Sequence, residues 1–257
     1  MPTVKDIASA IAARTHPEDT PEWDPVGLQL GDPDEEVDTV AVCHEVTEPV
    51  VSRLEESPVD LLVTYHPLLF TPTTRLLAGR SPGARSYRLI RSGVSLLVTH
   101  TDFDSCPGGM ADSLAALFDL GDVAEFGGDP AAALPAIGRY GAFNGTLATV
   151  DAIVVDEFGP GGVRINGDRE MIVGSLAVVP GSGSTLIEAA AEVAQALVTG
   201  DVGHHRAVAA LDLGLAVVDP GHTATERPGI RALVAMVTEV VGGEVVDLTS
   251  IDPRTWD

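Results

Sequence analysis

Apolar residues in the first half of the chain form short runs that alternate with segments of helical spacing. Residues 37–42, 59–64 and 94–98 predict strands, with predicted helices at 49–55 and between Ser81 and Gly93. A helix between successive strands favours parallel pairing, because a parallel connection has to cross over the sheet. This part of the chain therefore predicts an α/β fold with a mostly parallel sheet.

Two more helices are predicted from capping and periodicity. Thr3 and Asp6 are spaced as a capping box ahead of apolar residues at helical spacing, which predicts a helix as far as about Arg14. Met110 and Leu114 belong to a second amphipathic pattern.

Residues 127–135 interrupt the apolar pattern with glycine, aspartate, proline and a run of alanines, which predicts a domain boundary. We expect a first α/β domain over residues 1–127, with 224–257 packing back on it, and a second α/β domain over 128–223. In the second half the pattern predicts strands at 141–150, 152–155, 175–179, 215–218 and 244–248, and helices at 185–195, 205–213 and 229–241.

The excess of acidic over basic residues limits the classes of partner that the protein can bind. The chain has 38 acidic and 15 basic residues, a net charge of −23, and Lys5 is its only lysine. Nucleic-acid phosphates require a positive surface, so we expect no nucleic-acid partner. The acidity fits either solubility or a salt-rich habitat, and it attracts cations without creating a specific site.

Membrane and redox signals are weak. No apolar run reaches the roughly 18 residues of a membrane helix, and the N-terminus lacks the pattern of a signal peptide. Cys43 and Cys106 are too far apart for a CxxC motif and resemble reduced thiols. We expect a cytoplasmic protein without a membrane partner.

Histidines and carboxylates gather directly after three predicted strands. These residues are His66, His100 with Asp104, and His222 with Glu226. Open α/β sheets bind ligands at the carboxyl ends of their strands, and imidazole with carboxylate is a donor set for first-row divalent metals. The pattern predicts a shared metal site. For the last pair alone, a surface ion pair on a helix that soon reaches Pro228 is the alternative.

Two further motifs each have two interpretations. Gly181-Ser182-Gly183 between a strand and a helix fits either a phosphate cradle or a tight structural turn. His204 and His205 either line the same cavity as the predicted metal site or cap a helix.

In order along the chain, these motifs resemble the GTP cyclohydrolase I type 2-like family, also described as NGG-interacting-factor-three-like dinuclear metal proteins. The matching segments are 23–29 (WDPVGLQ, resembling WDNxGLQ), 45–47 (EVT, resembling DVT), 65–67 (YHP, resembling His-His-Pro), 100–104 (HTDFD, resembling HTNxD) and 219–226 (DPGHTATE). The ordered set covers most of the chain.

The resemblance implies two α/β domains, each a mixed or mostly parallel sheet flanked by helices, with the metal site at strand ends near the domain interface. It implies one or two divalent ions per chain, such as Zn, Mn, Fe, Ni or Co, and a homo-oligomer, a hexameric ring built from dimers or trimers. Carried over by position, His66, Asp104 and Glu226 hold one metal and His222 and Glu226 the second. Tyr65 stands where the family has the remaining histidine ligand, so the resemblance implies that the second ion is weakly bound, absent, or held by Tyr65 as a tyrosinate.

We therefore expect a metal-dependent hydrolase-like protein that acts on a nucleotide or another small heterocycle through metal-activated water, with His100 or His205 moving the proton. The family name implies GTP as a substrate. The alternative is a non-catalytic, ring-forming metal-binding scaffold with a metal-handling or regulatory role, and a purely structural metal is a third possibility. The sequence leaves open whether the chain is an enzyme.

Overall fold

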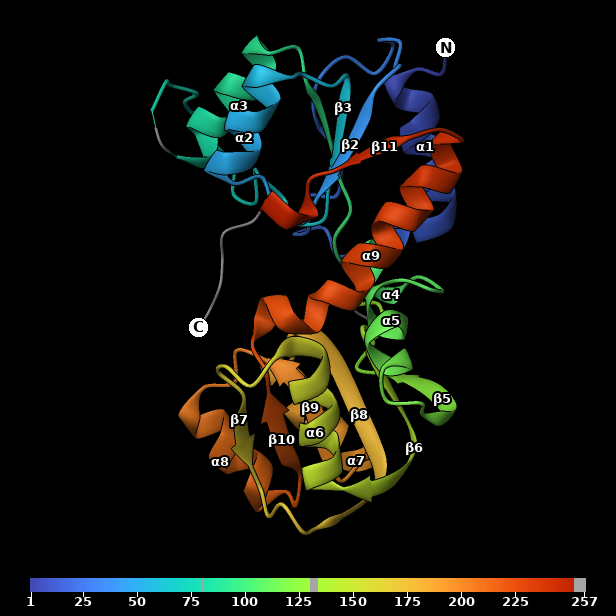
Figure 1. The fold of residues 1–257 in the computed structure, drawn as a ribbon, viewed down its shortest axis with the longest axis vertical. Helices are drawn as coiled ribbons and strands as arrows, with labels where there is room; N and C mark the ends of the chain where they lie inside the picture. Colours follow the sequence, from blue (N-terminus) through green and yellow to red (C-terminus); the bar gives the residue numbers. More distant parts are fainter. Residues whose placement is uncertain (80, 130–133, 252–257) are drawn as a thin grey trace. The chain divides into compact units, whose positions relative to one another are not determined.

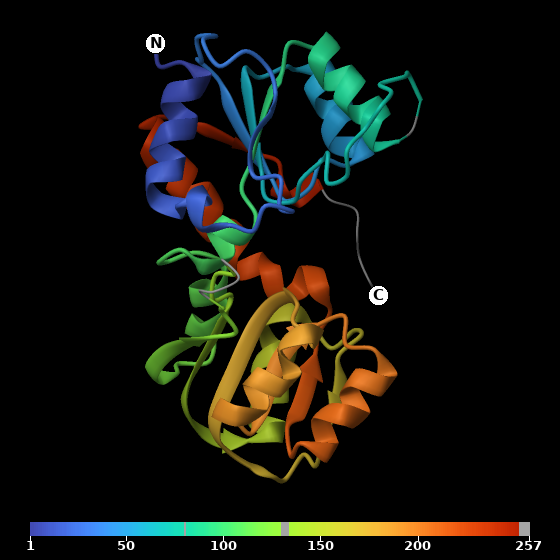
Figure 2. The same cartoon turned by 180° about the vertical axis from the view of Figure 1, so that it is seen from behind.

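The computed structural model describes residues 1–79, 81–129 and 134–251 (Figures 1 and 2). They form two compact units, which we call unit 1 (residues 1–106 and 230–251) and unit 2 (the described part of 107–229). Each unit has its own mixed sheet flanked by helices. This confirms the predicted fold class of two α/β units.

The sheet of unit 1 has the strand order β1-β4-β3-β2-β11. Its strands are β1 (Gly27–Leu30), β2 (Val40–Cys43), β3 (Leu61–Thr64), β4 (Ser95–Val98) and β11 (Val245–Asp247). The last four pair in parallel, while β1 runs antiparallel to β4. Every residue of β2, β3 and β4 is buried, as expected for parallel strands covered on both faces.

Helices cover both faces of this sheet. They are α1 (Val4–Thr15), α2 (Glu48–Glu56), α3 (Pro82–Arg91) and the later part of α9 (His222–Val241), with the short α4 (Thr101–Ser105) after β4. The predicted capping box of Thr3 and Asp6 is present. Helices α2 and α3 lie side by side and pack Leu54 and Leu89 against the sheet, while α1 and α9 lie on the other face (Figures 1 and 2).

The sheet of unit 2 has the strand order β5-β6-β8-β9-β10-β7. Its strands are β5 (Gly121–Phe126), β6 (Gly138–Thr146), β7 (Arg164–Asn166), β8 (Ile172–Ser182), β9 (Ala196–Gly200) and β10 (Ala216–Asp219). Strands β8, β9 and β10 are parallel and the outer pairs are antiparallel. The composition break at 127–135 lies between the paired strands β5 and β6, so the compact units divide elsewhere, at 106/107 and 229/230.

The helices of unit 2 form two layers around this sheet. They are α5 (Met110–Ala116), α6 (Leu147–Phe158), α7 (Ile187–Val193) and α8 (His204–Asp212). Strand β8 shows why: Leu176 and Val178 pack with α5 and α6, while Ala177 and Val179 pack with α7 and α8. Alternate side chains of one strand therefore serve two apolar cores.

One predicted strand is confirmed only in its first part, and the next one is wrong. The strand predicted at 141–150 coincides with β6 as far as Thr146, but residues 147–158, which include the predicted strand 152–155, form helix α6. Thr146 caps the helix by accepting a hydrogen bond from the backbone N–H of Thr149. Leu147, Val150 and Val154 are spaced three and four apart and are buried. The helical spacing and the cap outweigh the strand propensity of the valines.

The last helix also differs from its predicted start. It begins at His222 and continues through Pro228, where the sequence predicted an interruption and a start near 229. Proline in a helix removes one backbone hydrogen bond and costs about 3 kcal/mol. Thr225 before the proline and Leu233 after it are fully buried, and their packing offsets that loss. None of the helices in the described residues is long and apolar enough to cross a bilayer.

Candidate metal centre

The parallel strands of unit 1 bring several rings to one edge of the sheet. His44 follows β2, Tyr65 and His66 follow β3, and His100 comes shortly after β4. The ring centroids of His44 and His66 are 5.0 Å apart, and those of His66 and His100 are 5.7 Å apart. Because neighbouring parallel strands end at the same edge, three imidazoles that are distant in sequence become neighbours.

His100 is oriented by a buried carboxylate. Its Nδ1 donates to Asp24, at 2.9 and 3.0 Å from the two carboxylate oxygens. Thr101 donates to Asp24 as well, from its backbone N–H at 3.2 Å and its hydroxyl at 2.5 Å. Burial raises the pKa of Asp24, but the hydrogen bonds from His100 and Thr101 outweigh it and hold that pKa below its usual value. The Nε2 atom of His100 is then the one that can exchange a proton.

Asp102 stands where the HTNxD motif, which residues 100–104 resemble, has an asparagine. Its carboxylate accepts a hydrogen bond from the backbone N–H of His100 at 2.6 Å. Burial raises the pKa of Asp102, against the effect of its hydrogen bonds. Asp102 therefore fixes the backbone of His100 through this hydrogen bond.

Tyr65 and Asp104 form a pair of their own. Tyr65 is buried, and its hydroxyl donates to Oδ1 of Asp104 at 2.5 Å. Asp104 lies on α4 and is also buried. His66 has a carboxylate neighbour too, because its Nδ1 lies 3.6 Å from Oε2 of Glu45. Carboxylates behind ring nitrogens fix the orientation of histidines that bind metals.

In unit 2, the first turns of α9 present the two predicted residues together. His222 Nε2 lies 2.8 Å from Oε1 of Glu226, and His222 Nδ1 lies 2.8 Å from Oδ2 of Asp201. Glu226 is only 1% exposed. A neutral imidazole has a single N–H and can donate to only one of the two carboxylates. The contact with the other carboxylate is favourable when the second ring nitrogen carries a proton or binds a metal ion. The i, i+4 spacing thus forms a half-buried pair, with the Glu226 carboxylate inside the fold and the His222 side chain 34% exposed.

A glycine turn leaves room for these ligand atoms. Gly181 has φ +62°, and a Cβ there would lie 2.8 Å from Oε1 of Glu226 and 3.2 Å from Nε2 of His222. The N–H of Gly181 donates to Thr225, and that of Gly183 donates to Thr199. Both N–H groups are used inside unit 2, so the structure favours the tight structural turn over the phosphate cradle.

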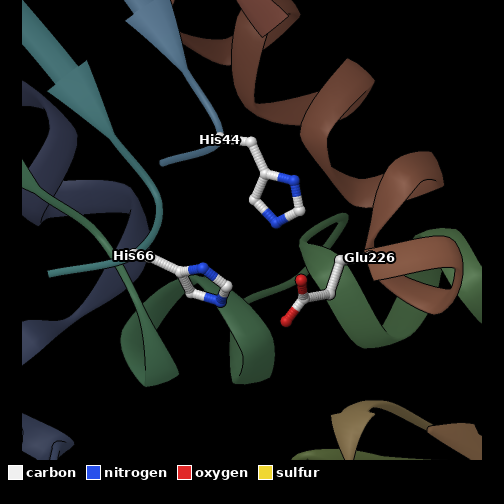
Figure 3. Close-up of side chains that lie close together, drawn as sticks. All are labelled: His44, His66 and Glu226. Carbon is white, nitrogen blue, oxygen red and sulfur yellow. The ribbon is translucent and has the colours of Figure 1, made fainter. Parts of the chain in front are cut away.

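Among the described residues, His44, His66 and Glu226 are side chains that could hold a metal ion. Figure 3 shows the imidazoles of His44 and His66 at the ends of β2 and β3, and the carboxylate of Glu226 on α9. Two imidazoles and one carboxylate are a donor set for Zn, Mn, Fe, Ni or Co. His44 is not among the ligands predicted from the sequence, although it follows a buried strand directly, the same signal that predicted His66.

The remaining predicted residues divide between the units. Unit 1 brings Tyr65, His100 and Asp104 to the sheet edge that carries His66. His205 is exposed on the first turn of α8, where its ring contacts that of His204. The described residues of unit 2 show no hydrogen bond or ring contact between His205 and His222, and a proton-transfer role for His205 stays a prediction.

Comparison with known proteins gives a consistent result. The family model described as Duf34/NIF3 (NGG1p interacting factor 3) matches residues 2–253. The GTP cyclohydrolase 1 type 2 homolog of Streptomyces coelicolor is 32% identical over 248 residues, which cover 93% of this chain and 87% of that protein. The homolog of Methanocaldococcus jannaschii is 28% identical over 230 residues, covering 88% of this chain and 91% of that protein.

Solved structures share the fold over nearly the whole chain. Reduced HcgD from Methanocaldococcus jannaschii has a TM-score of 0.82 at 26% identity and covers 96% of this chain and 97% of its own. A Bacillus cereus protein related to NIF3 has a TM-score of 0.87 at 20% identity, covers 100% and 99%, and shows the likeness of the fold alone. The resemblance seen in the motifs is confirmed, and the chain belongs to the Duf34/NIF3 (NGG1p interacting factor 3) family.

Proposed function

We propose that the protein is a metal-dependent hydrolase that acts on a small molecule, a nucleotide or another heterocycle, at a centre formed by the strand-end imidazoles of unit 1 and Glu226. The observation that carries this proposal is the pair His44 and His66, whose ring centroids lie 5.0 Å apart at the edge where α/β sheets bind ligands. The names of the curated relatives, GTP cyclohydrolase 1 type 2 homologs, support a hydrolytic reaction and a nucleotide as substrate.

The donor set fits a divalent ion. His44 and His66 offer neutral imidazole nitrogens, and Glu226 offers one negative charge from a buried carboxylate. Three protein ligands would leave a coordination position for water, as in catalytic and unlike closed structural sites. His222, which contacts Glu226, would join as a further ligand or hold a second ion beside the first.

A divalent ion, when bound, supplies Lewis acidity and lowers the pKa of a coordinated water to about 7. The residues of the chain supply the proton transfer. His100 accepts a proton from the attacking water at Nε2, while Asp24 holds Nδ1–H and stabilises the imidazolium. His100 then returns the proton to the leaving nitrogen or oxygen as the bond to the electrophilic carbon or phosphorus breaks.

The test of this proposal is a His100→Gln variant assayed against nucleotides, phosphoesters and nitrogen heterocycles. Removing a general acid–base group is expected to lower kcat/KM by about 10² to 10⁴ without changing the metal content. Metal-stripped wild-type protein should be inactive until a divalent ion is added. His16→Asn, at an exposed helix end in left-handed conformation that asparagine tolerates, is the matched control.

The rival function is a metal-binding scaffold without turnover. The presence of Tyr65, hydrogen-bonded to Asp104 where the resemblance implies a histidine ligand, favours it. Stoichiometric metal binding together with zero turnover of every compound by the wild-type protein would establish the scaffold and contradict the hydrolase.

We also propose that the chain forms a homo-oligomer, a hexameric ring built from dimers or trimers, in the cytoplasm. Cys43 and Cys106 are buried thiols, which suit a reducing compartment. Closed symmetric rings are a common form of homo-oligomer, and packing against copies would shield the strand-end site from solvent.

Light scattering is expected to give a mass near six times the 26.6 kDa of one chain. The measurement should be made at micromolar concentration in both low and high salt, because repulsion between acidic chains is screened by salt. A monomer under both conditions would contradict the ring.

A further inference from the structure

We infer that the four donor residues at the ends of β2 and β3 and on α4 sort into two pairs with different roles: His44 and His66 bind the metal ion, whereas Tyr65 is a positioning residue that holds Asp104. This inference rests on the proposed function, because it assigns the ligands of the same ion. It replaces the sequence expectation in which Tyr65 and Asp104 were ligands.

The hydrogen bond that Tyr65 donates distinguishes its role from that of His44 and His66. Its hydroxyl lies 2.5 Å from Oδ1 of Asp104, and the side chain is 2% exposed. The hydroxyl hydrogen of Tyr65 is directed at Oδ1 of Asp104, so this bond links the two side chains to each other. Tyr65 therefore fixes the Asp104 side chain at this sheet edge.

The register of the sheet places His44 where it can act instead. Cys43 pairs with Thr64 in the parallel ladder of β2 and β3, so the next residues, His44 and Tyr65, leave the sheet side by side. The backbone N–H of His66 donates to the carbonyl of His44 at 3.0 Å. Adjacent strands are about 4.8 Å apart, and a histidine one strand over can bring its ring next to His66.

The ring positions agree with this register. The centroid of His44 is 5.0 Å from that of His66 and 5.7 Å from that of Tyr65, and His44 is 5% exposed. A buried imidazole beside a second one suits a metal that prefers nitrogen ligands. With the imidazole supplied from β2 and Asp104 held by Tyr65, the chain binds one tight ion and not two of equal affinity.

Titration calorimetry of metal-free protein with Co²⁺ tests the division of roles. The wild type is expected to bind one ion tightly. His44→Ala is expected to weaken binding by at least about tenfold, the lower end of the loss seen for residues that merely support ligands. Tyr65→Phe keeps the ring and removes the hydroxyl, and its affinity should stay within about threefold of wild type or increase.

An exchange variant makes the test specific. Because position 65 lies one strand from position 44, the double variant His44→Ala/Tyr65→His should regain affinity to within about threefold of the wild type. His44→Gln, closer in size to histidine, repeats the loss if His44→Ala is poorly folded, and His16→Asn controls for removal of an imidazole elsewhere. Circular dichroism checks the fold of each variant.

The outcomes are distinct. If the wild type binds no ion, the proposed function itself fails. If the wild type binds Co²⁺ and His44→Ala and His44→Gln bind it equally well, only the role of His44 is overturned. If Tyr65→Phe loses as much affinity as His44→Ala, Tyr65 is a ligand and the two-pair assignment is wrong.

Discussion

Replacing Glu226 by glutamine is expected to remove most of the metal from the purified protein. Glu226 supplies the only negative charge among the three proposed ligands, and an amide oxygen binds a divalent cation far more weakly than a carboxylate does. The side chain is 1% exposed, so water cannot easily take its place. Elemental analysis after dialysis should find less than about a tenth of the wild-type metal content, a loss of at least tenfold in affinity.

The matched control is Glu239→Gln, the same change in the same helix. Glu239 is exposed and pairs with Arg14 at 2.8 Å, a surface ion pair that contributes at most about 1 kcal/mol. Its metal content should equal that of the wild type. Full metal content in Glu226→Gln would contradict the proposed centre.

Replacing Gly200 by alanine is expected to destabilise unit 2 and disturb the start of α9. A Cβ at Gly200 would lie 2.4 Å from the backbone nitrogen of His222, 2.5 Å from its Cα and 2.7 Å from the carbonyl oxygen of Gly181. These are backbone atoms, which cannot move aside as a side chain can. Overpacking of this kind costs about 1–3 kcal/mol, which circular dichroism should detect as a lower midpoint of thermal unfolding.

Gly161→Ala, elsewhere in unit 2, is the control for this change. Nothing lies within 4 Å of a Cβ at Gly161, and its φ lies outside the left-handed region, so alanine fits there. The midpoint should stay close to that of the wild type. Equal midpoints for Gly200→Ala and the wild type would show that β9 and α9 do not approach as closely as described.

The helices and strands that could be predicted from the sequence are those for which the apolar pattern, the length and the capping residues indicate the same element. The runs that became β2 and β3 are short, apolar and buried on both faces, and the helix α1 has its capping box in the sequence. The segment 147–158 could not be assigned correctly because its valines favour a strand while their spacing favours a helix. Packing against the sheet of unit 2 decides between the two, and that contact is not visible in the sequence.

The candidate site shows the same limit. His66, His222 and Glu226 could be named as candidate ligands because each follows an apolar run or has helical spacing. His44 could be recognised as a neighbour of His66 only once the pairing of β2 with β3 was known. The role of Tyr65 depends on a hydrogen bond to a residue 39 positions away, and no local pattern in the sequence predicts it.

Unit 1 is built from residues that precede unit 2 and residues that follow it, and this order affects its folding during protein synthesis. Unit 2, residues 107–229, leaves the ribosome complete, whereas the sheet of unit 1 waits for β11 to pair with β2 and for the N–H of Leu248 to bond to the carbonyl of Val42. At about 5–20 residues per second, synthesis of the roughly 200 residues between β2 and β11 takes on the order of tens of seconds. Until it ends, β2 is an open strand edge on which another nascent chain can add, so β11 protects the new protein against aggregation.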